Sequence, residues 1–216
     1  QEARRPSRGN DKTAELVENL EQQIAALKQQ NVNSPLMGTL YSDLGDAFEK
    51  QAAWEKALNA YGQTLEHYSD KDQGRRAEIL MKTGRALQAC RRYEPARDYY
   101  QQALELFEAT DNRREQPNAY FQLGNIALDQ REFEQARECY QQTLEIEISL
   151  EDRQGQASTY HQLGRVAQEL REYEQARSYY QQALAIKIEL NDHYRQASTY
   201  NQLGVVAEEL RVYEQA

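Results

Sequence analysis

The chain has 216 residues, of which 39% are hydrophobic and 28% charged, and its formal net charge is −9 at pH 7. This acidic excess argues against a nucleic-acid surface, since phosphate binding requires clustered Lys and Arg. No run of about eighteen apolar residues occurs, which argues against a membrane-spanning helix, and the scarcity of Gly and Pro favours an all-α fold.

The first 32 residues precede the repetitive part of the chain. Residues 1–10 lack the apolar core of a signal peptide and are predicted to form a disordered basic tail or linker. Residues 11–32 are predicted to form an N-terminal capping helix, helical over 11–30, with apolar residues at heptad spacing: Val17, Leu20, Ile24 and Leu27. Two interpretations stay open. The helix covers the exposed end of a repeat array, or it pairs as a coiled-coil dimer, for which two heptads are short.

Residues 33–216 contain a sequence that recurs at a nearly constant interval. The pentapeptides 120–124, 160–164 and 200–204 share the pattern Tyr-x-Gln-Leu-Gly and lie 40 residues apart, and divergent copies end at Gly84 and Gly45. Nine residues after each glycine stands an aromatic residue: Trp54, Tyr93, Phe133, Tyr173 and Tyr213. Three residues later comes an alanine: Ala57, Ala96, Ala136, Ala176 and Ala216. Four residues beyond each of the first four alanines is a tyrosine: Tyr61, Tyr100, Tyr140 and Tyr180.

The spacing within one unit is helical. An apolar stripe at i, i+3, i+4 and i+7 runs through Tyr160, Leu163, Gly164, Ala167 and Leu170, and a second stripe follows from Tyr173 onward. Small Gly and Ala residues at facing positions let two helix backbones approach closely, so we predict a helical hairpin in each unit. The predicted A and B helices span 35–51 and 54–68, 73–91 and 94–109, 113–131 and 134–149, 153–171 and 174–190, and then 193–211 alone.

Helix-start signals support this register. The residue twelve before each glycine is a good N-cap: Asn33, Asp72, Asn112, Asp152 and Asp192. Glu115 follows Asn112 by three residues, as in a capping box, and Pro95 falls in the first turn of its helix. The predicted repeats are therefore 33–71, 72–111, 112–151, 152–191 and a truncated fifth, 192–216.

This pattern of Leu-Gly, aromatic, alanine and tyrosine resembles the tetratricopeptide repeat (TPR) family. The resemblance implies a right-handed superhelical solenoid of antiparallel helix pairs that binds protein segments. It departs from the family in a unit of 40 residues rather than about 34, in the absence of the closing proline, and in Thr83, which replaces the leucine before Gly84. The longer unit looks like the repeats of kinesin light chains, of the Pins/LGN scaffolds and of the sensor arrays of bacterial signalling ATPases.

The resemblance also implies a concave groove lined by A-helix residues that lie three before, two before and one after each glycine. The candidate groove residues are Met81, Lys82, Arg85, Phe121, Gln122, Asn125, His161, Gln162, Arg165, Asn201 and Gln202. Their amide side chains offer donors and acceptors to the backbone of an extended segment. Lys82, Arg85 and Arg165 favour an acidic or carboxylate-bearing partner. The alternative is that these polar residues are merely solvated copies of one repeat.

Signals of catalysis and of cofactor or metal binding are lacking in the sequence. His67, His161 and His193 have no partner residues in a recognisable catalytic motif, and no Gly-rich phosphate loop occurs. Cys90 and Cys139 show no metal-ligand spacing and are expected to be small buried residues in a reducing compartment, which predicts a cytoplasmic protein without cofactors.

Three functions follow as hypotheses. The first is a non-catalytic scaffold or adaptor that binds a peptide or helical segment in the groove. The second is the sensor array of a larger signalling ATPase or protease, since a chain that begins with Gln and stops at Ala216 is expected to be a piece of a longer protein. The third is self-association through the N-terminal helix or the C-terminal edge.

Overall fold

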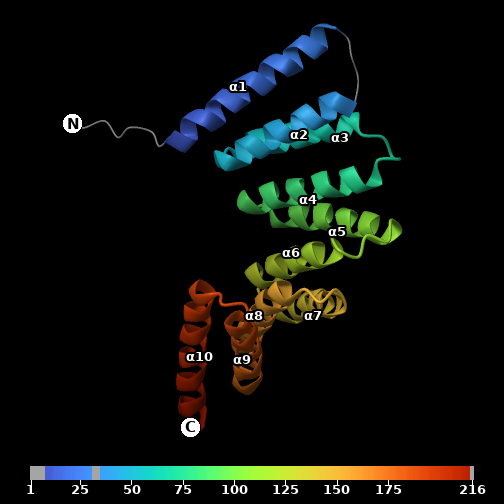
Figure 1. Ribbon diagram of the computed structural model, residues 1–216. Coiled ribbons are helices and arrows are strands. Elements are labelled where there is room, and N and C mark those ends of the chain that lie inside the picture. The colour runs from blue at the N-terminus through green and yellow to red at the C-terminus, as the bar shows by residue number, and fades with distance from the viewer. Residues whose placement is uncertain (1–7, 31–34, 215–216) are drawn as a thin grey trace, which may run out of the picture. The chain divides into compact units, whose positions relative to one another are not determined.

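The structure, a computed structural model, describes residues 8–30 and 35–214, and every element in these ranges is an α-helix. The chain divides into two compact units, residues 1–110 and 111–216, and the helices of both are labelled in Figure 1. The first unit contains α1 (Arg8–Gln29), α2 (Pro35–Lys50), α3 (Trp54–His67), α4 (Gln73–Ala89) and α5 (Tyr93–Ala109). The second contains α6 (Gln116–Asp129), α7 (Phe133–Ser149), α8 (Arg153–Glu169), α9 (Tyr173–Glu189) and α10 (His193–Glu214).

The hairpin prediction agrees with the structure, with all bounds of α2 to α10 within three residues of those predicted. The helices α2 and α3, α4 and α5, α6 and α7, and α8 and α9 pack as pairs, and α10 packs on α9. Two boundaries differ most. The helix predicted from 113 begins at Gln116, and α10 continues to Glu214. The predicted tail also ends earlier, since residues 8–10 are already helical, while residues 1–7 lie outside the described part.

A glycine facing a tyrosine brings each A helix close to its B helix. Tyr100 and Tyr180 are fully buried, and a Cβ placed on Gly84 or Gly164 would lie only 2.6–2.8 Å from the ring of the partner tyrosine. No side chain fits there without moving the ring, so the glycine is required by close approach rather than by backbone conformation. The recurring sequence pattern is therefore the core contact of the hairpin.

The predicted N-caps hold in some repeats and fail in others. The Asp152 carboxylate accepts from the backbone N–H of Gly155 at 2.9 Å, and Asp192 accepts from that of Arg195 at 3.0 Å. Asp72 stands at the N-cap position of α4 but makes no side-chain cap bond, and the prediction for Asn112 is wrong. The side chain of Asp72 turns back to accept from Ser69. Asn112 lies outside α6, whose N-cap is Glu115 and whose second residue is Pro117. The remaining predicted cap, Asn33, lies outside the described residues.

Seven of the described helices, α2 and α4 to α9, end in turns that place one residue in the left-handed conformation. After α4, Arg91 has φ 58° and donates its N–H to the Gln88 carbonyl, while Arg92 donates to the Leu87 carbonyl, both at 2.9 Å. This is the Schellman arrangement, which usually selects glycine. Here the left-handed residues all carry a side chain: Ala52, Arg91, Asp111, Arg131, Glu151, Arg171 and Asn191.

The N-terminal helix packs onto the first hairpin. Leu20 and Ile24 are 5% exposed and belong to the same core as Met37 and Phe48 of α2, with Val17 partly buried beside them. This packing is what the capping interpretation requires. Among the residues that the structure describes, none of the helices has both the length and the apolar character needed to cross a membrane.

Candidate functional site

The candidate groove residues all lie on A helices. Of these residues, Arg85, Arg165 and Asn201 are exposed, and the other eight are half-buried. Met81, Lys82 and Arg85 belong to the first unit, and the remaining eight belong to the second.

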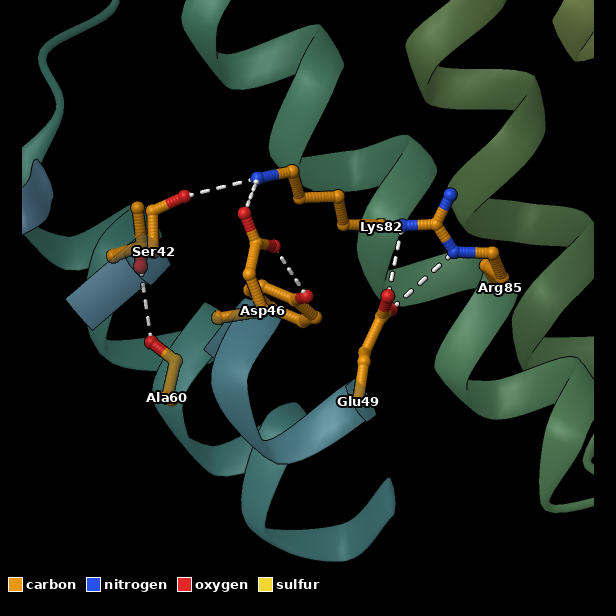
Figure 2. A network of polar contacts seen from close by, with 8 residues as sticks. Ser42, Asp46, Glu49, Ala60, Lys82 and Arg85 are labelled. Carbon is orange, nitrogen blue, oxygen red and sulfur yellow. Dashed lines mark hydrogen bonds and ion pairs between the residues drawn. The ribbon is translucent and has the colours of Figure 1, made fainter. Parts of the chain in front are cut away.

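In the first unit, the basic residues are balanced by acids of the preceding repeat. Figure 2 shows Lys82 of α4 reaching to α2, where its Nζ donates to Asp46 Oδ2 at 2.7 Å and to Ser42 Oγ at 3.2 Å. The guanidinium of Arg85 contacts both carboxylate oxygens of Glu49, at 2.9 and 3.3 Å. The positive charge expected from these two residues is thus neutralised within the unit.

In the second unit, the corresponding positions form a chain of amide hydrogen bonds. Arg165 donates to Gln162 Oε1 at 2.9 Å, Gln162 donates to Asn125 Oδ1 at 3.2 Å, and Asn125 donates to Gln122 Oε1 at 3.2 Å. Because arginine has no acceptor, it fixes the orientation of Gln162, and each amide then fixes the next. The amide oxygens of Gln162, Asn125 and Gln122 each accept a hydrogen bond. Each of these amides has two N–H donors, and the described residues do not supply acceptors for all of them. The surface is therefore rich in donors.

One substitution separates the two networks. Glu49, the acid that pairs with Arg85, stands four residues after its repeat glycine, and the same position in the second unit is Leu128. Arg165, which corresponds to Arg85, accordingly makes no ion pair with the described residues. The apolar residue at this position removes the ion-pair partner that Arg85 has.

The tyrosine hydroxyls follow the same alternation. Where the residue after the glycine accepts hydrogen bonds, the hydroxyl donates to it at 2.8 Å: Tyr61 to Asp46 and Tyr140 to Asn125. Where that residue is arginine, the hydroxyl donates at 3.1 Å to a glutamine three residues later: Tyr100 to Gln88 and Tyr180 to Gln168. Burial raises the pKa of all four tyrosines, so the hydroxyls stay protonated donors.

The second unit also holds a pocket of about 620 Å³ between α6, α8, α9 and α10. Five predicted groove residues line it: Phe121, His161, Gln162, Arg165 and Asn201. Gln122, Asn125 and Gln202 of the same unit are not among its lining residues. The sequence analysis missed five others: Ser158, Lys187, Tyr194, Arg195 and Ser198. Ser158 and Ser198 occupy the same repeat position, three residues before the predicted groove residues His161 and Asn201. The spacing of the repeats could therefore have identified them.

The ring of His161 packs against the ring of Tyr180, with 5.3 Å between the ring centroids. Its Nδ1 is buried and has no hydrogen-bond partner among the described residues. Burial, with Lys187 and then Arg165 acting in the same direction, lowers the pKa of His161 to about 4. The imidazole is therefore neutral at pH 7.

Lys187 is a charged residue in a core position. Its side chain is 5% exposed, and its Nζ donates to Thr199 Oγ1 at 2.7 Å. Burial lowers the pKa of Lys187, while the charge of Asp192 opposes that effect. The same repeat position is occupied by Phe107 and by Glu147 in the two preceding repeats. Aligning the repeats places Lys187 where Phe107 stands in the core, and this replacement could have identified Lys187 from the sequence.

Glu147 is the acidic counterpart at this repeat position. It is 6% exposed, and its carboxylate lies close to the hydroxyl of Thr159. Burial raises the pKa of Glu147 to about 7. It is not among the residues that line the pocket.

The described residues offer no grouping of three or more His, Cys, Asp or Glu side chains that could hold a metal ion. Cys90 and Cys139 form no disulfide and are half-buried, so the expectation that both are buried is wrong. The Cys90 thiol lies beside Glu55, and burial together with that carboxylate raises its pKa.

Comparisons with known proteins address the family. The family model described as tetratricopeptide repeat matches residues 75–149 and 155–216, more than half of the chain. Comparison with curated proteins gave no match.

Solved structures share the fold at low identity. BtubC from P. vanneervenii is 20% identical with a TM-score of 0.77, and the match covers 96% of this chain and 85% of that one. A signal transduction ATPase with numerous domains (STAND) from Pyrococcus horikoshii, which has a tetratricopeptide repeat sensor, is 19% identical with a TM-score of 0.75, covering 87% and 30%. A Rap protein complexed with Competence and Sporulation Factor is 20% identical with a TM-score of 0.67, covering 93% and 60%.

The last two matches span less than two thirds of the proteins concerned. At these identities they establish the all-α repeat fold, in which hairpins stack as in an α-α superhelix. The family match agrees with the glycine-facing-tyrosine hairpins of both units. The chain belongs to the tetratricopeptide repeat family, whose repeats form protein-interaction modules.

Proposed function

We propose that the chain is a non-catalytic protein–protein interaction module, acting as a scaffold or adaptor, that binds a peptide or helical segment across the A helices of its second unit. The observation that carries this proposal is the polarised amide chain from Arg165 through Gln162 and Asn125 to Gln122. We also propose a cytoplasmic location, because neither Cys90 nor Cys139 forms a disulfide.

The amide chain favours a partner that supplies acceptors. Its oxygens are already bonded, and the N–H groups that remain on Gln122 and Gln162 need carbonyl or carboxylate oxygens. An extended peptide presents such carbonyls whatever its side chains are. The half-buried ring of Phe121, packed edge-on against Tyr140 with 5.4 Å between centroids, adds an apolar contact beside these donors.

The proposal is tested with a random library of 16-residue peptides, selected for binding to the purified chain. We expect binding peptides to emerge and to lose about tenfold in affinity for the variant Gln122→Ala, Gln162→Ala. Each lost hydrogen bond contributes about 0.5–1.5 kcal/mol, and about 1.4 kcal/mol corresponds to a factor of ten. Fluorescence anisotropy with labelled peptides measures the affinities.

The matched control is the variant Gln142→Ala, Gln181→Ala, which removes two exposed glutamines from the B helices α7 and α9. Its affinities should equal those of the unmodified chain. Peptides that bind both variants equally well would show that another surface is used. A failure to select any peptide would contradict the proposal.

The similarity to a STAND protein with a tetratricopeptide repeat sensor favours a second candidate, the sensor array of a larger signalling protein. That candidate requires an ATPase or protease domain on the same polypeptide. It predicts that a selected peptide changes the rate of nucleotide or peptide hydrolysis by the full-length protein. An unchanged rate at saturating peptide would leave only the adaptor proposal.

A further inference from the structure

The pocket of the second unit contains a buried cation that makes no ion pair with a carboxylate of the described residues. Lys187 is 5% exposed, and the hydrogen bond that its Nζ donates goes to the neutral hydroxyl of Thr199. A buried charge is costly unless an opposite charge or several hydrogen bonds compensate it. Lys187 therefore has no direct ion-pair partner in the described part of the chain, although such a position normally requires one.

The other charged groups around the pocket increase this deficit. Arg165 of α8 makes no ion pair with the described residues. Arg195, in the first turn of α10, contacts Asp192 at 3.4 Å, and Asp192 is the acidic group that acts on Lys187. The lining of the pocket thus holds three cations and no carboxylate.

The neutral groups of the pocket point to the same kind of ligand. His161 Nδ1 is buried without a partner among the described residues, and the ring is held neutral by burial and by its two cationic neighbours. An anion in the pocket would offset those charges, and the imidazole could then take up a proton and donate it to the anion. Ser158 and Ser198 line the same pocket with hydroxyl donors.

We propose that the pocket between α8, α9 and α10 is an anion site that takes a carboxylate of the bound peptide, held by Arg165, Lys187 and Arg195. This inference rests on the proposed peptide-binding function and specifies where an acidic residue of the peptide is held. The ligand group is an Asp or Glu side chain or a C-terminal carboxylate. Its oxygens accept from the guanidinium groups and from the Lys187 ammonium group.

The first test needs no peptide. Glutarate and inorganic phosphate are titrated separately into the chain at constant ionic strength, and the ring resonances of His161 are followed by NMR. Glutarate is expected to shift these resonances saturably and to raise the pKa of His161 from about 4 toward its ordinary value. Saturation by phosphate with no effect of glutarate would overturn the carboxylate assignment.

Variants separate the pocket from the rest of the surface. Arg195→Gln and Lys187→Met should each weaken glutarate binding about tenfold, since a hydrogen bond to a charged group is worth roughly that factor. Arg177→Gln is the matched control, because Arg177 is exposed on α9 and pairs with Glu174. If Lys187→Met does not fold, Arg195→Gln decides alone, and equal affinity of Arg195→Gln and the control would contradict the proposal.

Peptides from the library distinguish this inference from the function on which it rests. Selected peptides should lose about tenfold in affinity when one acidic residue, or the C-terminal carboxylate, is replaced by its amide. That loss should disappear in Arg195→Gln. Peptides that bind but respond to neither change would leave the interaction function standing and overturn the anion site. Glutarate binding without any peptide ligand would do the reverse.

Discussion

The A helices of the two units carry different chemistry at the same repeat positions. In the first unit Lys82 and Arg85 are bound to Asp46 and Glu49, so donors and charges are matched within the fold. In the second unit amides replace the Asp–Lys pair, and the arginine that corresponds to Arg85 has Leu128 where Glu49 would stand. Both versions keep the same hairpin, which shows that the fold does not require either network.

The comparison separates residues that build the repeat from residues that are open to use. The glycine and the tyrosine are constant in the first four repeats because the two backbones meet there. The positions two before and one after the glycine vary between charges and amides. A closed ion-pair network contributes to stability, whereas an open donor network leaves its hydrogen-bonding capacity for a ligand.

The largest effect is expected for the residues that both units share. Tyr100→Ala and Tyr180→Ala should each lower the free energy of unfolding by about 3–5 kcal/mol, since a large ring is lost from a fully buried site. Urea unfolding followed by circular dichroism measures both. The exposed Tyr194→Ala serves as the control and should change stability by less than about 0.5 kcal/mol. A negligible change at Tyr180 would contradict the hairpin core.

The next effect concerns Glu147, which in the second unit occupies the repeat position of Phe107. The pKa of Glu147 in the folded protein is about 7, above the ordinary 4.5, because burial favours the protonated form. The contribution of this group to the free energy of unfolding is therefore complete below pH 4.5 and is lost as the pH rises through 7. Glu147→Gln should therefore raise the free energy of unfolding by about 1–3 kcal/mol at pH 8 and leave it unchanged near pH 4.

The control for this experiment is Glu145→Gln, an exposed position on the same helix. It should show no comparable pH dependence. Unfolding curves at pH 4, 6 and 8 provide the measurement. A stability difference between Glu147→Gln and the unmodified chain that is equal at all three pH values would show that the carboxylate does not titrate there.

A smaller effect is expected when the closed network of the first unit is opened. Asp46→Asn removes the charge that faces Lys82 and should cost about 0.5–1 kcal/mol, because the pair is partly exposed. The cost should be smaller in 1 M salt, because the Debye length falls from about 10 Å at 0.1 M to about 3 Å at 1 M. Asp43→Asn, exposed on the same helix, is the control. A salt-independent loss would attribute the effect to packing.

The smallest effect is expected in the second unit. Arg165→Gln should change the free energy of unfolding by less than about 0.5 kcal/mol, since Arg165 is exposed and has no acidic partner among the described residues. Arg85→Gln, which loses Glu49, is the matched comparison. A loss above about 1 kcal/mol for Arg165→Gln would mean that this arginine stabilises the fold and is not held ready for a ligand.

The fold was predictable because its main contact is local in sequence. The glycine and its partner tyrosine, such as Gly164 and Tyr180, are sixteen residues apart in every full repeat. The same core contact therefore occurs four times. Boundaries were less predictable. Asn112 has the right residue type for an N-cap, but the chain from Asp111 to Glu115 forms turns, and the helix starts one residue before Pro117.

The site was predictable by position and not by pairing. The spacing placed Lys82 and Arg165 on A-helix faces, but the acid that neutralises Lys82 lies 36 residues away on another helix. Whether a given cation has such a partner depends on how repeats stack. Lys187 was not predicted as a site residue, because its repeat position on the B helix is typical of a core residue, and its burial depends on the packing of α10 on α9.

The side chains at the left-handed turns bear on how such an array evolves. A side chain at a left-handed position costs about 1 kcal/mol of local strain. A glycine there would instead raise the conformational entropy of the unfolded chain, which lowers stability by about 0.4–1 kcal/mol. The two choices are therefore nearly equivalent in stability. Ala52, Arg91, Glu151 and Asn191 show that the position accepts unlike residues. Mutational drift at these joints is close to neutral, and a 40-residue cassette that begins and ends at one can be duplicated without first acquiring a special residue.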